Sequence, residues 1–374
     1  MVNPPVWRAS THLYRDTAER AERAGSSGDF EFYYGRRGAP TQWALADALT
    51  ALEPGAEGTV LYPSGTSALA QALLTVLRPG DSVLVADNVY EPTRHIASGL
   101  LKTFGIAARF FDPFDRDAYA AAYDDTTKAV MLESPGSLTM EVCDVPALAA
   151  IAQDKGAVSL LDNTWATSLG FPALKHGCDI AITALTKHHG GHSDVMMGAA
   201  SAAKPLYARL RQSARQFGIV VSPDDAALVT RGMRTMAVRL AQESKTALTL
   251  ARWLADRAEV AAVFCPMLDG APGNDLWKRD FAGGCGLFSF ALTPEHSPAD
   301  RDALIDALEL FGIGYSWGGF ESLALPVDPA PIRTATNWPP NNELGPMVRL
   351  SIGLEDEADL RADLDRAFTK FKLA

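Results

Sequence analysis

Short apolar segments alternate with helical segments along residues 41–230, and this alternation restricts the possible folds more than any other feature of the chain. The apolar segments are predicted strands at residues 82–86, 108–111, 129–133, 158–161 and 180–185. Strands that alternate with helices in this way favour a mostly parallel sheet with helices on both faces. We therefore predict an α/β fold.

The chain has 374 residues, enough for about two domains. Residues 1–40 are predicted to be an irregular N-terminal arm that lies on another surface, and residues 41–230 an α/β domain. Residues 231–374 are predicted to be a smaller α+β domain. A long amphipathic segment at 225–261 is expected to connect them. The expected elements of the last domain are strands at 287–292 and 347–352 and helices at 299–310 and 357–371.

Composition excludes several classes of protein. The formal net charge is −11 and there is no lysine/arginine run, which opposes nonspecific nucleic-acid binding. The longest apolar runs are far shorter than the roughly 20 residues that cross a bilayer, and no apolar signal segment opens the sequence. Four widely spaced cysteines are expected to be reduced, buried thiols. We therefore predict a cytoplasmic protein that binds neither nucleic acid nor membrane. The cysteines are Cys143, Cys178, Cys265 and Cys285.

Lys187 is the first candidate for chemistry. It follows the predicted strand 180–185 and precedes the pair Gly190 and Gly191. Burial disfavours a charged amine and lowers its pKa. Such an amine can form a Schiff base with an aldehyde, as in enzymes that use pyridoxal 5′-phosphate (PLP). The alternative is a surface lysine whose ammonium group reaches water.

Asp162 ends the predicted strand 158–161. A carboxylate at this edge of the sheet could keep the pyridine nitrogen of PLP protonated, which makes the ring an electron sink. The alternative is an aspartate that only caps a turn with Asn163 and Thr164.

Gly65 and Thr66 open a predicted helix, and Tyr90 follows the strand 82–86. Free amides at the helix start could bind phosphate, or the segment could be an ordinary cap. Tyr90 could stack on a flat ring, or it could simply pack in the core. Open α/β sheets bind ligands at the carboxyl ends of their strands. The order of phosphate loop, aromatic residue, acid and lysine therefore predicts a PLP site.

Three histidines follow the lysine: His188, His189 and His192. A zinc site would need them on one face of a helix, but Gly190 and Gly191 disfavour a helix there. We predict no metal site.

Eight ordered strings resemble those of the Cys/Met-metabolism family of PLP-dependent enzymes, over the chain from about Asn3 to its C-terminus. They are YYGRRGAPT (33–41), SGTSA (64–68), YEP (90–92), LESPGS (132–137), DNTWA (162–166), TKHHGGHSD (186–194), GYSWGGFESL (314–323) and RLSIGLED (349–356). The resemblance implies the aspartate-aminotransferase-like fold (fold type I) and PLP as cofactor.

The resemblance also implies a role for each matching residue. The catalytic residues would be Lys187, which holds PLP and moves protons, Asp162, which pairs with the pyridine nitrogen, and Tyr90, which stacks on the ring. The phosphate contacts would come from Gly65, Thr66 and Thr186, and from Tyr34 and Arg36 reaching into a neighbouring subunit's site. Arg349 would bind the substrate α-carboxylate, and Ser316, Trp317 and Tyr34 would line the substrate side.

The chain departs from the family pattern in three places. Ala184 stands where many relatives have a serine, which removes one hydroxyl from the phosphate site. His188 stands where relatives usually have a tyrosine. The arm is also short before Asn3, which could reduce contacts between subunits.

The implied reaction is β-elimination of an amino-acid thioether. L-Cystathionine would yield L-homocysteine, pyruvate and ammonia, as in methionine biosynthesis. Within the family, the segment with Ser316 and Trp317 is most similar to the β-lyases. The alternatives are a cysteine-S-conjugate β-lyase of broad specificity, a γ-lyase or γ-synthase, and a PLP-binding regulator with little turnover. The implied assembly is a homotetramer built from dimers with shared active sites.

Overall fold

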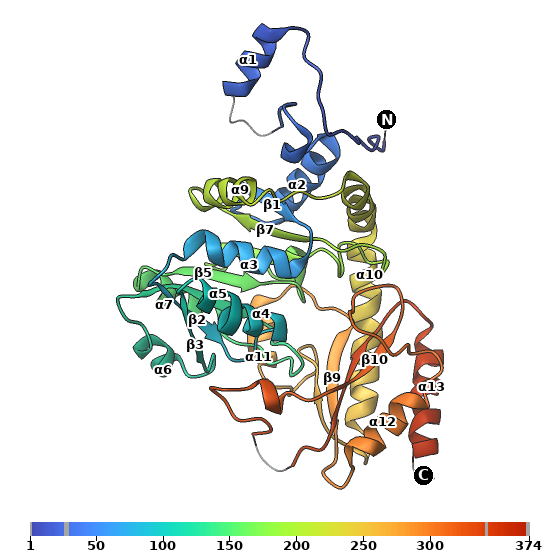
Figure 1. Ribbon diagram of the computed structural model, residues 1–374. Coiled ribbons are helices and arrows are strands. Elements are labelled where there is room, and N and C mark those ends of the chain that lie inside the picture. The colour runs from blue at the N-terminus through green and yellow to red at the C-terminus, as the bar shows by residue number, and fades with distance from the viewer. Residues whose placement is uncertain (1, 26–29, 341–342, 372–374) are drawn as a thin grey trace.

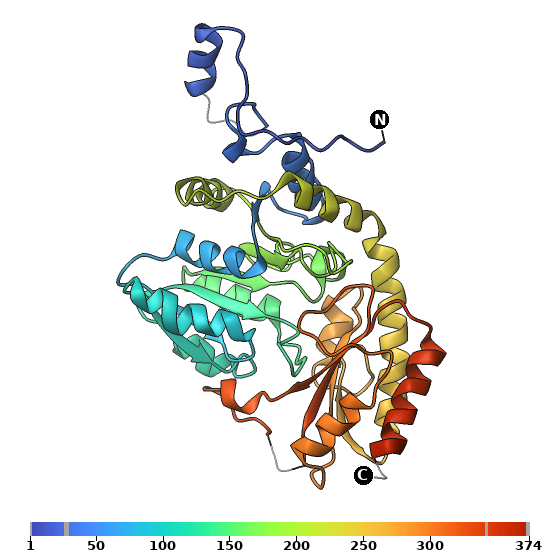
Figure 2. The same cartoon turned by 45° about the vertical axis from the view of Figure 1, so that its right-hand side comes forward.

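The computed structural model describes residues 2–25, 30–340 and 343–371, and it contains two sheets joined by one long helix (Figures 1 and 2). The larger sheet has seven strands in the order β1-β7-β6-β5-β4-β2-β3. Its strands are β1 (Gly58–Tyr62), β2 (Ser82–Ala86), β3 (Ala107–Phe111), β4 (Thr127–Glu133), β5 (Val158–Asp162), β6 (Ile180–Ala184) and β7 (Gly198–Ala202). The two pairings of β7, with β1 and with β6, are antiparallel and the other pairings are parallel, so the predicted mostly parallel α/β sheet is confirmed.

Helices cover both faces of this sheet. Adjacent residues of β7, Ala199 and Ala200, belong to two different buried clusters because successive strand residues point to opposite faces. One cluster receives α3 (Gly65–Val76), and the other receives α2 (Pro40–Leu52). The remaining helices of this region are η1 (Gly35–Arg37), α4 (Glu91–His95), η2 (Ile96–Leu100), α5 (Leu101–Thr103), α6 (Arg116–Ala121), α7 (Val145–Asp154), α8 (Thr167–Gly170) and α9 (Leu206–Gln216).

The smaller sheet is antiparallel, with strands in the order β10-β11-β9-β8. Its strands are β8 (Val260–Phe264), β9 (Leu287–Leu292), β10 (Leu323–Val327) and β11 (Met347–Ser351), accompanied by α11 (Asn274–Asp280), α12 (Pro298–Asp306), η3 (Ala330–Ile332) and α13 (Glu357–Phe371). The expected strands and helices of this region are present, and β8 and β10 are additions that the sequence pattern did not reveal.

The connecting helix is α10 (Pro223–Ala255), which has 33 residues and begins at Ser222, whose hydroxyl accepts hydrogen bonds from two first-turn amides. The expected amphipathic segment 225–261 was too long, because its last residues turn into β8. The predicted boundary at residues 230/231 falls inside α10. The division into an arm and two domains therefore remains a prediction.

The sequence predicts an irregular arm over residues 1–40, but the structure contains a helix there. The helix is α1 (Thr17–Gly25), in which Glu19 and Arg23 form an ion pair one turn apart. Alanine, glutamate and arginine are strong helix formers, and pairs at this spacing stabilise a helix without a core. Residues 26–29 lie outside the described residues. The arm extends away from the body of the molecule (Figure 1).

The other structural expectations can be compared directly. The four cysteines are buried and unpaired, as predicted. Among the described helices, none combines the length and the apolar character that a membrane crossing needs.

Candidate functional site

Lys187 lies in the turn that follows β6, at the carboxyl edge of the larger sheet. Its Nζ donates a hydrogen bond to Ser316 Oγ (2.6 Å) and lies 5.2 Å from the centre of the Trp317 ring. Burial, together with the charge of Arg349, lowers the pKa of Lys187 to about 8, and Asp162 partly opposes this shift. The amine is therefore easier to deprotonate than an ordinary lysine, as Schiff-base chemistry requires.

Asp162 is the last residue of β5 and is buried. Its Oδ1 accepts hydrogen bonds from the amide (3.0 Å) and the hydroxyl (2.6 Å) of Thr164. Burial raises the pKa of Asp162, while Thr164 and the charge of Lys187 lower it. Asp162 thus caps the turn, as the simpler interpretation expected. Among the described residues none donates to Oδ2, which leaves that oxygen for a ligand.

The start of α3 has the features of a phosphate-binding turn. Ser64 accepts hydrogen bonds from the amides of Ser67 and Ala68, through its hydroxyl and its carbonyl oxygen respectively. The amides of Gly65 and Thr66 belong to the first helical turn, where no intrahelical acceptor exists. A Cβ on Gly65 would lie 2.6 Å from the Cβ of Ala184, so glycine is needed there. Ala184 packs directly against the turn and supplies no hydroxyl.

Thr186, the third expected phosphate contact, has an engaged hydroxyl. Its Oγ1 accepts a hydrogen bond from the amide of Met197 (3.0 Å) and lies 3.2 Å from the Met197 carbonyl oxygen, to which it donates. These bonds tie the residue before Lys187 to the residue that precedes β7.

Tyr90 lies at the start of α4, with its amide donating to Glu133 Oε2 (2.7 Å). Burial raises the pKa of the Tyr90 hydroxyl, as do the charges of Glu133 and Asp162, while Arg349 lowers it. Tyr90 is therefore within electrostatic reach of two other candidate residues. Glu133 was missed from the sequence, although it ends β4 beside Asp162.

Arg349, on β11, reaches the same place from the smaller sheet. Its Nη2 donates to the carbonyl oxygen of Ser316 (3.1 Å), and burial lowers its pKa. Ser316 has φ = 88°, a conformation that costs a non-glycine residue energy. Ser316 is thus held between Lys187 and Arg349 in a strained conformation, which is typical of functional sites.

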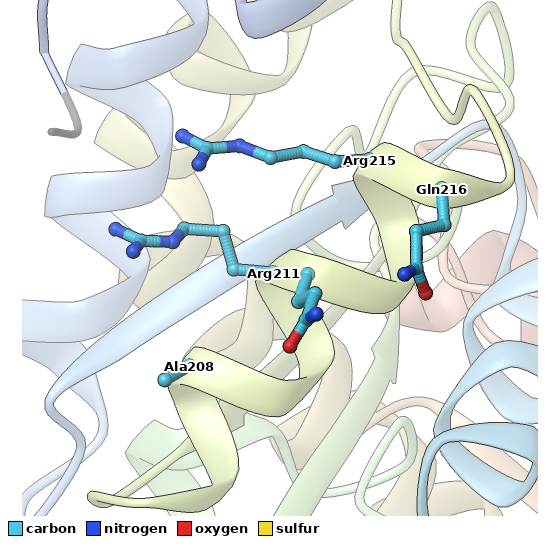
Figure 3. Close-up of a pocket in the computed structure, with 5 residues that line it drawn as sticks. Ala208, Arg211, Arg215 and Gln216 are labelled. Carbon is cyan, nitrogen blue, oxygen red and sulfur yellow. The ribbon is translucent and has the colours of Figure 1, made fainter. Parts of the chain in front are cut away.

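Tyr34 and Arg36 are not brought to this site within the chain. Tyr34 pairs with Thr11 in the arm, and Arg36 donates to the carbonyl oxygen of Arg215 on α9 (3.1 Å). Figure 3 shows Arg211 and Arg215 extending to the same side of α9, beside a surface hollow. Arg36 and these arginines line a second hollow nearby.

The three histidines after Lys187 differ in their exposure. His188 and His189 are buried, whereas His192 is exposed and bonds the Gly190 carbonyl oxygen. Within the described residues there is no group of three or more metal-binding side chains that could hold an ion. The absence of a metal remains a prediction.

The residues gathered at the sheet edge fit PLP. A deprotonatable lysine, a buried carboxylate with a free oxygen, a helix start with unpaired amides and an aromatic side chain supply one contact for each part of the cofactor. Two of these contacts come from the starts of α3 and α4, one from the end of β5 and one from the turn that follows β6. The arginine that the smaller sheet contributes suits a substrate carboxylate.

Comparison with known proteins agrees with the geometry. The family described as "Cys/Met metabolism PLP-dependent enzyme" matches residues 1–369. The Escherichia coli protein "Cystathionine beta-lyase MetC" is 40% identical over 99% of this chain and 94% of its own length. The Wolbachia pipientis "L-alanine/L-glutamate racemase" is 34% identical over 99% of this chain and 93% of its own length. The crystal structure of cystathionine gamma synthase from Xanthomonas oryzae in complex with cystathionine matches with a TM-score of 0.89 and 31% identity. The match covers 100% of this chain and 94% of the chain in that structure.

Fold and site together define an α/β enzyme that uses PLP. The chain belongs to the Cys/Met-metabolism family of PLP-dependent enzymes, and the family resemblance seen in the sequence is confirmed.

Proposed function

We propose that this enzyme is a carbon–sulfur lyase that cleaves L-cystathionine by β-elimination, yielding L-homocysteine, pyruvate and ammonia. The observation that carries the proposal is the placement of Ser316 and Trp317 against the Lys187 amine. The names of relatives such as the Escherichia coli cystathionine β-lyase support the substrate. The activity would serve methionine biosynthesis, and we expect it in the cytoplasm.

Each site residue then has a defined task. Arg349 binds the substrate α-carboxylate, for which a guanidinium offers paired donors. The deprotonated Lys187 amine removes the Cα proton, and Ser316 Oγ orients that amine. Asp162 would hold a proton on the pyridine nitrogen of bound PLP, and Tyr90 would pack on its ring. Bound PLP supplies the electron sink that makes the Cα proton acidic.

Trp317 favours β- over γ-elimination. γ-Elimination requires a second deprotonation, at Cβ, and therefore a pocket that lets a base reach that carbon. The indole of Trp317 is bulky and lies beside the Lys187 amine, so it restricts the poses in which Lys187 can reach Cβ. The similar structure of cystathionine gamma synthase has the same fold, so the fold alone does not distinguish β- from γ-elimination.

A product assay tests the proposal. Purified protein with added PLP and L-cystathionine is expected to form pyruvate with little 2-oxobutanoate, both measured by chromatography. Trp317→Ala should raise the share of 2-oxobutanoate, whereas Trp317→Phe, which keeps an aromatic ring, should change it less. If 2-oxobutanoate dominates for the wild type, the β-lyase assignment is wrong. Conversion of L-alanine to D-alanine without keto acid would instead indicate the racemase reaction of the Wolbachia relative.

The position of the arm supports a shared site between subunits. Among the described residues, Tyr34 and Arg36 contact the arm and α9 and make no contact with Lys187 or Arg349. We infer that they complete the phosphate site of a neighbouring subunit in a homo-oligomer, most simply a homotetramer built from dimers.

Mixing two inactive variants tests this arrangement. Arg36→Ala and Lys187→Ala should each lose activity, but a hybrid dimer contains one site with both native residues. After subunit exchange, up to about a quarter of all sites should be active. Recovery of activity is measured as pyruvate formation. The matched control mixes the double variant, Arg36→Ala with Lys187→Ala in one chain, with the single variant Lys187→Ala. A fully active monomer in light scattering would contradict the shared site.

A further inference from the structure

A buried pair of titratable side chains lies next to the site and has no part in the chemistry described above. His188 follows Lys187, and its Nδ1 lies 3.7 Å from Glu243 Oε2 on α10. The side chains are 1% and 0% exposed. Neither carboxyl oxygen of Glu243 accepts a hydrogen bond from the residues that the structure describes. An unpaired polar pair at this depth costs folding free energy, so its presence calls for a function.

The pair connects to the substrate side through Trp317. The imidazole of His188 meets the Trp317 ring edge-on, with the ring centres 5.3 Å apart. The same indole lies 5.2 Å from Lys187 Nζ. Glu243, His188, Trp317 and Lys187 thus form a continuous row of contacts from the connecting helix to the reactive amine.

The segment that carries His188 is fixed to the same helix. Arg239, one turn before Glu243, donates from Nη2 to the carbonyl oxygens of His188 (2.7 Å) and Gly232 (2.9 Å). Gly191 has φ = 66° and lies against the Arg239 guanidinium, where a larger residue would not fit. The His188 backbone cannot shift easily, so changes in the pair are transmitted to its side chain and to Trp317.

The pair is uncharged at neutral pH. Burial lowers the pKa of His188 to about 3, assisted by the neighbouring His189, Arg239 and Lys187. Burial raises the pKa of Glu243 to about 8; Arg239 opposes this shift and Glu321 adds to it. Other titratable groups near the pair are His189 and Cys285, both buried. Below about pH 8 a carboxylic acid therefore faces a neutral imidazole, and above it a buried carboxylate appears.

We propose that His188 and Glu243 are positioning residues that hold Trp317 against the substrate. The proposal rests on the proposed function and adds two residues to its specificity. In the protonated form, a shift of about 1 Å brings the Glu243 hydroxyl within hydrogen-bond distance of His188 Nδ1. Loss of that proton removes the donor and creates a buried charge, so that Nδ1 must carry the hydrogen and donate to the carboxylate instead. This reversal shifts the imidazole and the indole that packs on it.

Glu243→Gln separates positioning from simple packing, because an amide keeps the shape and a donor but does not titrate. At pH 7 the variant should have nearly wild-type kcat and KM for L-cystathionine. Between pH 7 and 9 the wild-type KM should rise relative to that of the variant by about fivefold, with kcat changing less. His188→Phe, which keeps the aromatic contact but lacks nitrogen, should also remove this difference.

A second measurement does not depend on turnover. Trp317→Phe is made in the wild type and in Glu243→Gln. Subtracting the fluorescence of each Trp317→Phe protein from that of its parent gives the signal of Trp317. That signal should change near pH 8 in the wild type and stay constant with Glu243→Gln. If wild-type protein forms no pyruvate, the proposed function fails while the fluorescence still tests the pair. Equal pH profiles for wild type and Glu243→Gln, in KM and in fluorescence, would overturn the proposal, as would a change confined to melting temperature.

Discussion

Replacement of Lys187 by alanine is expected to abolish pyruvate formation and to remove the visible absorbance of the cofactor-loaded protein. Lys187 is the partly buried amine of the site, with a pKa lowered to about 8, and it is within hydrogen-bond distance of Ser316. Loss of a residue that both holds the cofactor and transfers the proton should lower kcat by about 10³-fold or more.

The matched control is Lys175→Ala, which changes an exposed lysine of the same region. That variant should keep its colour and rate. Absorbance spectra and a coupled pyruvate assay make the comparison, and circular dichroism verifies the fold. A Lys187→Ala protein that retains a visible band and a tenth of the wild-type rate would show that another amine holds the cofactor.

Replacement of Asp162 by asparagine should lower kcat and kcat/KM together, by about 100-fold or more. Both fall because the negative charge matters most when electrons move into the ring, and an amide cannot hold a pyridinium. The fold should be unchanged, since the asparagine oxygen can still accept the bonds from Thr164. Steady-state kinetics across L-cystathionine concentrations measure both constants.

Glu133→Gln is the comparison for this experiment. Glu133 is the neighbouring carboxyl, and burial and the charge of Asp162 raise its pKa well above the ordinary value. Glu133 has no part in holding the ring nitrogen, so its amide replacement should cost much less activity. A near-wild-type kcat in Asp162→Asn, or equal losses in the two variants, would refute the role given to Asp162.

The strands of the larger sheet could mostly be predicted because their apolar runs are bounded by turn residues. The prediction at 82–86 coincides with β2, and that at 287–292 coincides with β9 in the smaller sheet. β7 was missed because its sequence, Gly-Ala-Ala-Ser-Ala, has neither β-branched nor aromatic residues. Pairing with β1 and β6 makes it a strand, and that pairing is a tertiary property.

The residues of the candidate site were also only partly predictable from the sequence. Lys187, Asp162 and Tyr90 could be found because each follows a predicted strand, and such ends meet at one edge of a sheet. Arg349 and Ser316 could be named only through family resemblance, since Arg349 lies on β11 of the smaller sheet and Ser316 in the loop that precedes β10. Their roles remain predictions. Glu133 and Glu243 carried no pattern of their own, and only packing reveals what they face.

The length of α10 is under a restriction that an ordinary linker would not have. The helix joins the two sheets and also places Arg239 and Glu243 behind the turn that carries Lys187. One inserted residue would rotate everything beyond it by about 100° and advance it by about 1.5 Å. Insertion before Arg239 would turn both side chains away from His188, and insertion after Glu243 would swing the smaller sheet, with Arg349 and Ser316, away from Lys187. Chain-length variation should therefore be tolerated in surface loops and excluded from this helix.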